Sequence, residues 1–170
     1  MLTKALIEQI YNQELSIATK TYAINLWAHQ PASSVTYIDS KTKLGLASYT
    51  GQISINTRFL ATATTNLLIN TLRHEISHLI AGVGQGHNKH FKRVASALDV
   101  KSNESFDELA VILSKIDFKY TVIAHFVDGG NQKIGGVHRK TAKYTRYNSL
   151  ENKNMSIEGR PIKEFEFIVN

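Results

Sequence analysis

The chain has 170 residues, of which 42% are hydrophobic and 20% charged, as expected for a soluble globular protein with a core of its own. It contains no cysteine, which excludes disulfides and thiolate metal ligands, so any transition-metal site must use His, Asp or Glu. No stretch reaches the ~18–20 apolar residues of a membrane span. Glu8 and Glu14 interrupt the N-terminal segment where a signal peptide would be apolar. We therefore expect a cytoplasmic protein with no membrane partner.

The net charge of +6 is concentrated in the C-terminal third of the chain. Residues 119–153 hold seven Lys or Arg against two Asp or Glu, whereas residues 1–118 hold 11 against nine. A local basic surplus indicates a polyanion partner such as nucleic acid, and the alternative is a solvated basic face.

The N-terminal segment predicts a long helix. Apolar residues recur near helical spacing over residues 3–29, and neither Gly nor Pro occurs before Pro31. A break at Glu14 or Ser16 is compatible with this pattern. The sequence therefore predicts one helix, or two consecutive helices, before the first strand.

A small sheet is predicted next. Residues 34–39 and 52–56 alternate apolar and polar side chains, as half-buried strands do. Between them, Gly45 and Gly51 indicate a turn, a short strand and a second turn. Together these segments predict three short strands.

The clearest helix of the chain follows the predicted sheet. Thr65 or Asn66 can cap its start, and Gly82 suits its end. At about 100° per residue, five apolar side chains gather on one side; they are Leu68, Leu72, Ile76, Leu79 and Ile80. His74 and His78 lie on the opposite side, so this helix would bury one face and present two histidines on the other.

Two further helices and a β-rich region complete the predicted elements. A helix beginning at Asn88 would bury four side chains, which are Phe91, Val94, Ala95 and Leu98, and another covers residues 106–115. From residue 119, "KYTVIAHFVDGG", "KIGGVHRKTAKYTRYN" and "IKEFEFIV" predict strands separated by turns. The predicted fold class is α+β, with a first domain over 1–117 and a β-rich basic lobe over 118–170.

Residues 74–78 read "HEISH", which is an HExxH pattern. Histidines at positions i and i+4 project from one helix face and can bind a single zinc ion. Glu75 follows the first histidine and can accept a proton from a metal-bound water. A shuffled chain of this composition contains the pattern with a probability of roughly 1 in 70, so chance is a rival that further ligands must weaken.

A catalytic zinc site needs a third protein ligand and an open position for water. His87 follows the glycine-rich loop at 82–86, which is long enough to return over the end of the helix. His90 lies one helical turn further along. Spacing alone also allows a carboxylate as the third ligand, and the candidates are Asp99, Glu104 and Glu108.

These features resemble the SprT-like (Spartan-type) zinc metallopeptidases. The HExxH pattern, a short glycine-containing loop and then "GHNKHF" follow the family's order and its GH-x-x-x-F spacing, and "LGLASYTGQISINTRFL" and "LLINTLRHEISHLI" are similar to its strand and helix. The resemblance covers about residues 5–100 and implies a zincin-like helical core, one Zn²⁺ per chain and Glu75 as the catalytic glutamate. The implied zinc ligands are His74, His78 and His87. His90 stands where the family often carries an acidic residue, and no role is assigned to it.

The C-terminal lobe departs from the family's pattern. Many bacterial relatives end in a zinc ribbon with paired cysteines, and residues 118–170 contain none. We predict either a degenerate, ribbon-like lobe without its metal or an unrelated β-extension. His125 and His138 are interpreted as packing or surface residues, not as ligands of a second metal.

The resemblance implies a zinc metalloendopeptidase that acts on polypeptides, and relatives such as Spartan cleave DNA-bound proteins with the help of a separate DNA-binding element. The basic lobe is the candidate for that element. Its predicted DNA contacts are Lys133, Arg139, Lys140, Lys143, Tyr144 and Arg146. Two alternatives stay open: a non-proteolytic zinc-containing module that binds nucleic acid or protein, and a zinc hydrolase acting on a small amide.

Overall fold

The computed structural model describes residues 1–101, 106–151 and 155–170. These residues form five α-helices and two small sheets of three and four strands, so the predicted α+β class is confirmed. The chain divides into two compact units, Met1–Ile116 and Asp117–Asn170, and each is described by itself. Within the described ranges, no helix combines the length and the apolar character needed to cross a bilayer.

Helix α1 (Lys4–Thr21) is shorter than the helix predicted over residues 3–29. The backbone becomes extended at Tyr22, and a short 3₁₀ turn, η1 (Ile24–Leu26), follows. The indole Nε1 of Trp27 donates a hydrogen bond of 2.9 Å to the carbonyl of Tyr22. Trp27 is buried, and the end of the helix at Thr21 lets its ring pack in the core.

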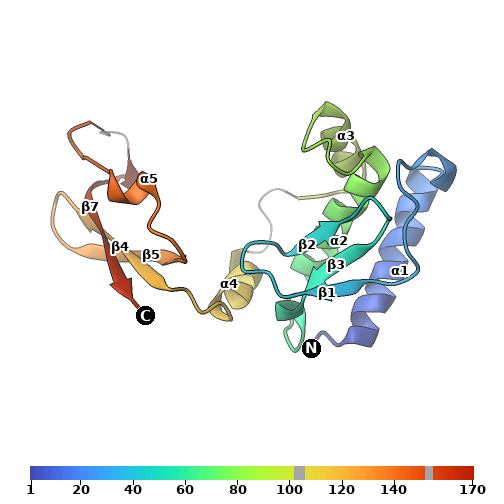
Figure 1. Ribbon diagram of the computed structural model, residues 1–170, viewed down its shortest axis with the longest axis horizontal. Coiled ribbons are helices and arrows are strands. Elements are labelled where there is room, and N and C mark those ends of the chain that lie inside the picture. The colour runs from blue at the N-terminus through green and yellow to red at the C-terminus, as the bar shows by residue number, and fades with distance from the viewer. Residues whose placement is uncertain (102–105, 152–154) are drawn as a thin grey trace. The chain divides into compact units, whose positions relative to one another are not determined.

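The first unit contains a three-stranded mixed sheet, as predicted. Its strands are β1 (Thr36–Ile38), β2 (Gly45–Ala47) and β3 (Ile53–Asn56). Strand β3 is central, pairing in parallel with β1 and antiparallel with β2. Ile53 and Ile55 are fully buried, so β3 anchors the sheet in the core. Because β3 is central, β2 is an edge strand (Figure 1).

Helix α2 (Thr65–Ala81) packs against this sheet beside α1 (Figure 1). The predicted apolar face is confirmed as buried; it comprises Leu68, Leu72, Ile76, Leu79 and Ile80. The helix ends at Gly82, whose φ of 108° favours glycine. Helix α3 (Lys89–Ala97) begins next to Asn88, as predicted, and the side chain of Asn88 caps it. Helix α4 (Phe106–Ser114) completes the unit.

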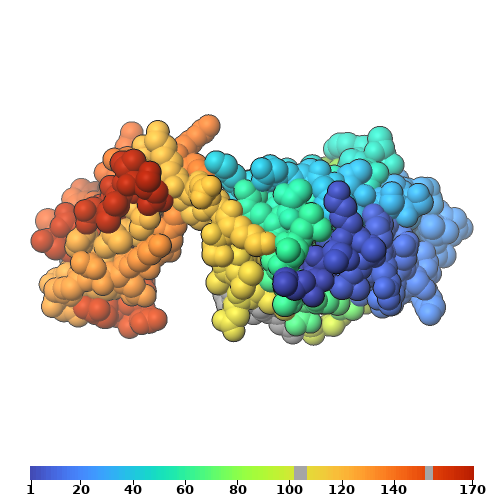
Figure 2. Space-filling view, turned by 90° about the horizontal axis from the view of Figure 1, so that it is seen from below, coloured from blue at the N-terminus to red at the C-terminus, as the bar shows by residue number. Residues whose placement is uncertain are grey.

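The sequence suggested that Thr65 or Asn66 caps the start of α2, and this prediction is wrong. The N-cap is Thr64, and its side chain makes no capping hydrogen bond. Instead, the Glu108 carboxylate of α4 accepts a hydrogen bond of 2.6 Å from the amide of Leu67. A negative charge at a helix N-terminus is favourable, so α4 supplies the cap from a distant part of the sequence. In Figure 2 the residues near the start of α2 (green) lie between α1 (blue) and α4 (yellow).

A partly buried ion pair joins α1 to α2 close to the histidines. Glu14 is only 6% exposed, and its carboxylate accepts a hydrogen bond of 2.7 Å from Nε of Arg73. Arg73 also pairs with Asp99 at 3.3 Å. Helix α1 therefore continues through Glu14, without the break that the sequence allowed, because this residue has a structural partner.

The second unit is an antiparallel four-stranded sheet in the order β5-β4-β7-β6. Its strands are β4 (Tyr120–Phe126), β5 (Asn131–Val137), β6 (Ser156–Ile157) and β7 (Arg160–Val169). The small core comprises Ala124, Phe126 and Ile162.

One predicted strand segment of this unit is wrong beyond Val137. Part of "KTAKYTRYN" forms a one-turn helix, α5 (Ala142–Thr145). Tyr144 lies within this turn, and Tyr147 follows it after the C-cap residue Arg146. Both rings pack edge-on against Phe165, at 4.9 and 5.0 Å between ring centroids. The aromatic contacts with β7 favour the turn over a strand.

Candidate metal centre

Three histidines of the first unit converge on one point. His74 and His78 lie one turn apart on α2, and His87 comes from the loop between α2 and α3. One ring nitrogen of each lies within 4.8 Å of the others. The Nε2 atoms of His74 and His87 are 3.2 Å apart. The two predicted helix positions and the predicted loop position are thus brought together.

The loop returns His87 to the helix through three glycines. Gly82, Gly84 and Gly86 have φ angles of 108°, 87° and 60°, in the left-handed region that side chains disfavour. Asn88 then caps α3 by accepting a hydrogen bond of 2.9 Å from the amide of Phe91. The glycines reverse the chain and the cap ends the reversal, so His87 is held between two fixed helices.

Phe91 supports all three histidine rings. Its ring centroid lies 5.1 Å from that of His74, 4.3 Å from that of His78 and 4.7 Å from that of His87. The side chain is only 4% exposed. Sequence periodicity identified Phe91 as buried but not as a support for the histidines. The signal that could have identified it is its i+4 spacing from His87.

The electrostatics of the cluster favour neutral histidines. Burial, together with the neighbouring His78 and His87, lowers the pKa of His74 from 6.5 to about 4. Burial and His87 also lower the pKa of His78. Neutral imidazole is the form that binds a metal ion. Tetrahedral Zn²⁺ with bonds of ~2.0–2.1 Å places its ligand atoms ~3.4 Å apart, so the His74–His87 separation and the donor set fit zinc.

Glu75 lies beside the histidines and is buried, with 7% of its surface exposed. Its Oε2 accepts a hydrogen bond of 2.9 Å from the backbone amide of Ala47, in strand β2. Burial raises the pKa of Glu75 from 4.5 to about 7, although the Ala47 amide and the charge of Lys43 oppose this shift. A carboxyl group with this pKa can both accept and release a proton near neutral pH.

Gly45 leaves room for Glu75, a contact that the sequence did not predict. A Cβ atom at this position would lie 2.8 Å from Cγ of Glu75 and 2.8 Å from Cγ2 of Thr71. Strand β2 therefore positions the Glu75 carboxylate in two ways. The Ala47 amide donates a hydrogen bond to it, and the absence of a Cβ at Gly45 leaves space for it. The glycine itself was visible in the sequence, but its partner was not.

The site opens into a cavity of about 740 Å³ between β2, α2 and the glycine loop. The rival ligands lie elsewhere. His90 is exposed on α3 and is not part of the three-histidine group. Asp99 pairs with Arg73 and Lys101, Glu108 caps α2, and Glu104 lies outside the described residues.

In the second unit, lysines and aromatic rings gather near α5. Nζ of Lys140 lies 5.2 Å from the ring centroid of Tyr120 and 5.3 Å from that of Phe167. Nζ of Lys143 lies 5.4 Å from the ring centroid of Tyr144, which itself packs against Phe167 at 6.1 Å. With Lys119, which lies over Tyr120 at 5.4 Å, these residues form what we term the lysine–aromatic cluster.

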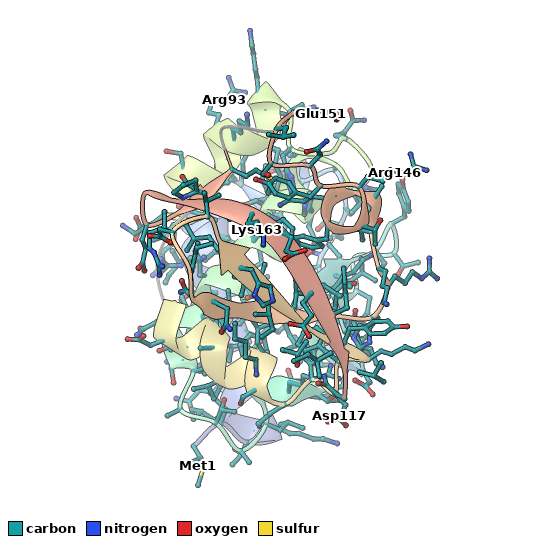
Figure 3. The ribbon with its side chains drawn as sticks, turned by 90° about the vertical axis from the view of Figure 1, so that its left-hand side faces the viewer. Met1, Arg93, Asp117, Arg146, Glu151 and Lys163 are labelled. Atoms are coloured by element: carbon teal, nitrogen blue, oxygen red, sulfur yellow. The ribbon has the colours of Figure 1, made fainter. Side chains whose placement is uncertain are left out.

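Lys133 does not belong to this cluster. The strand register pairs Lys133 with Ile123 and Phe167 with Val122. Neighbouring residues of a strand point to opposite faces, so Lys133 and Phe167 lie on different sides of the sheet. The other two predicted contacts are both exposed; they are Arg139 and Arg146. Figure 3 labels Arg146.

The two histidines of the second unit have other neighbours. His125 Nε2 lies 2.8 Å from a carboxylate oxygen of Glu166, and the ring of His138 packs on Phe118 at 5.1 Å. Among the described residues, the one group of three potential metal ligands is that of the first unit.

An α+β domain that brings three histidines and a buried glutamate to one cavity is of the kind that can hold a metal ion. The sequence model of the SprT-like family matches residues 10–109. The match spans more than half of the chain, and the chain belongs to the SprT-like family, as the resemblance implied. Comparison with curated proteins and with solved structures gives no significant match.

Proposed function

We propose that the chain is a zinc-dependent metallopeptidase that hydrolyses polypeptides. The observation that carries this proposal is the convergence of three histidine nitrogens within 4.8 Å, next to a buried glutamate. Membership of the SprT-like family supports it. His74, His78 and His87 would hold one zinc ion per chain. When bound, zinc would supply Lewis acidity, polarising the scissile carbonyl and making water a stronger acid.

Glu75 acts as the general base in this proposal. Its pKa of about 7 lets the carboxylate take a proton from the attacking water and pass it to the leaving amine. The Ala47 amide holds one carboxylate oxygen, Oε2, at 2.9 Å, which orients the group. Burial keeps bulk water from this carboxylate, so its proton transfers are directed to groups in the cavity.

The edge strand β2 favours a polypeptide over a small amide as substrate. The carbonyl of Leu44 and the amide of Ser48 bond to the chain at either end of β3. Because backbone groups alternate along a strand, those of Gly45 and Ala47 point away from β3. The Ala47 amide donates to Glu75, so the Gly45 amide and the carbonyls of Gly45 and Ala47 are the groups left for a substrate strand. An extended polypeptide can pair with such an edge by adding a further strand. The cavity lies along this edge, next to Glu75.

Metal analysis and peptide hydrolysis test the proposal. We expect one zinc per purified wild-type chain and a large loss of zinc in His87→Ala, because three ligands are the smallest catalytic set. Glu75→Gln should retain zinc and lose hydrolysis by ~10²–10⁴-fold, since an amide cannot accept the proton. Glu75→Gln turnover within tenfold of wild type would contradict the mechanism. A zinc-loaded chain that cleaves no polypeptide would favour the alternative of a non-proteolytic binding module.

The lysine–aromatic cluster favours a second proposal, that the C-terminal unit binds DNA. Lys140 and Lys143 can neutralise phosphates, and Tyr120 and Tyr144 offer ring surfaces to unpaired bases. We expect weak, sequence-independent binding with a preference for single strands, lost steeply as salt rises. A peptidase that binds DNA in this way would act on DNA-associated proteins.

Charge reversal tests the DNA proposal separately from the peptidase. The four-fold variant is Arg139→Glu, Lys140→Glu, Lys143→Glu and Arg146→Glu. It should lose binding to a labelled oligonucleotide in a low-salt anisotropy titration, with its zinc content unchanged. Equal binding by wild type and variant, or no binding by either, would refute the DNA proposal and leave the peptidase proposal intact.

A further inference from the structure

The cavity beside Glu75 has the length of a short extended peptide. On the helix side its lining runs from Leu67 to His78. Eleven helical steps of 1.5 Å span about 16 Å. An extended chain advances ~3.3 Å per residue, so about five residues would lie along this groove. On the strand side the lining runs over residues 42–47, which include the edge strand β2.

Charge is unevenly distributed along the groove. Among the described residues that line it, Lys43 is the only Lys or Arg, and it stands at one end of the strand side. Lys43 is exposed, and no carboxylate of the described chain pairs with it. The other residues near this end are neutral; they are Thr42, Leu44, Leu67, Asn70 and Thr71.

The position of Lys43 relative to the reacting bond follows from the strand. Gly45 and Ala47 both lie next to Glu75. Along the chain, Gly45 is two residues from Lys43 and Ala47 is four residues from it. A substrate strand paired with β2 advances at the same rate per residue as β2 itself. The substrate side chain beside Lys43 is therefore two to four residues from the bond attacked at Glu75.

We propose that Lys43 determines specificity by selecting polypeptides that carry Asp or Glu two to four residues from the cleaved bond. This inference rests on the proposed peptidase function and names the substrate class of the same groove. A carboxylate at that point pairs with the unpaired ammonium, whereas a substrate Lys or Arg is repelled. The preference weakens as salt rises, because Lys43 is exposed to solvent.

Cleavage specificity provides the first test. The zinc-loaded full chain digests a peptide library, and mass spectrometry maps the cleaved bonds. Matched peptides with Glu or Lys at the selected position then give kcat/KM at low salt. We expect about a twofold to fivefold preference for Glu in wild type, the scale of an exposed, screened ion pair. The preference should invert in Lys43→Glu and persist in Lys41→Glu, a control two residues away that does not line the groove.

Binding provides a readout that does not depend on turnover. In this test the zinc-loaded Glu75→Gln protein is titrated with the same labelled peptides, and the Glu peptide should bind more tightly unless Lys43 is also changed to Glu. Equal binding of the two peptides, or the same preference with and without Lys43, would overturn the inference. If the preference holds in binding but no peptide is cleaved by wild type, Lys43 selects acidic peptides and the peptidase proposal alone fails.

Discussion

Replacing Gly45 with Ala tests whether strand β2 positions the carboxylate of Glu75, the proposed general base. The new Cβ would lie 2.8 Å from Cγ of Glu75, 3.1 Å from its Oε1 and 2.8 Å from Cγ2 of Thr71. Carbon atoms in contact prefer ~3.5–4.0 Å, so relief requires a movement of ~1 Å. Gly45 has no left-handed backbone conformation, so alanine adds no backbone strain of its own.

Two magnitudes follow from this overlap. Overpacking of a buried site costs about 1–3 kcal/mol of unfolding free energy. A misplacement of a catalytic group by ~1 Å lowers the rate by ~100-fold. The three atoms nearest to the added Cβ belong to Glu75 and Thr71 and not to the histidines, so we expect the zinc content to be unchanged. We therefore expect Gly45→Ala to keep its metal and to lose mainly kcat, because the displaced group acts in the transition state.

The assay compares kcat, KM, zinc content and thermal unfolding of wild type and variant on one fluorogenic peptide. Gly136→Ala is the matched control, since its Cβ would meet the ring of Phe118, and both residues belong to the C-terminal unit. This control should destabilise the C-terminal unit and leave the metal centre intact. If Gly45→Ala retained kcat within threefold of wild type, strand β2 would not position Glu75.

Three further changes test other parts of the structure. Phe91→Ala should lower the unfolding free energy by ~3–5 kcal/mol, measured by urea denaturation, and weaken zinc binding in a chelator competition, because this buried ring supports all three histidines. Glu14→Ala should destabilise the fold by about 3 kcal/mol in the same denaturation, since it leaves Arg73 without its buried partner; a loss below 0.5 kcal/mol would count against this. Burial raises the pKa of Tyr11 from 10.0 to about 12, so the folded state keeps the neutral phenol and loses stability as pH rises from 10 to 12. Tyr11→Phe should lose the hydrogen bond to the Ala32 carbonyl, which lowers its stability at pH 9. It should also lack the alkaline destabilisation, so its unfolding free energy should fall less than that of wild type between pH 9 and pH 11.5, as measured by denaturation at both pH values.

The sequence alone determined the features that depend on short-range geometry. The spacing of His74 and His78 placed both on one helix face, since a helical turn relates positions i and i+4. The same periodicity identified the buried side of α2, and Asn88 marked the start of α3. The glycines before His87 indicated a reversal of the chain, and the family's motif then selected His87 over His90.

Only the tertiary structure decided the features that join distant segments. The amide of Ala47 reaches Glu75 across 28 residues, and no local pattern reports that contact. The cap that Glu108 provides for α2 likewise comes from another helix, so capping propensity at the start of α2 could not reveal it. Strand register separated Lys133 from Lys140, which lies over Phe167, because a shift of one residue moves a side chain to the opposite face of the sheet. Sequence spacing thus fixed which side chains one helix presents, and the packing of sheet against helix decided what Glu75 touches.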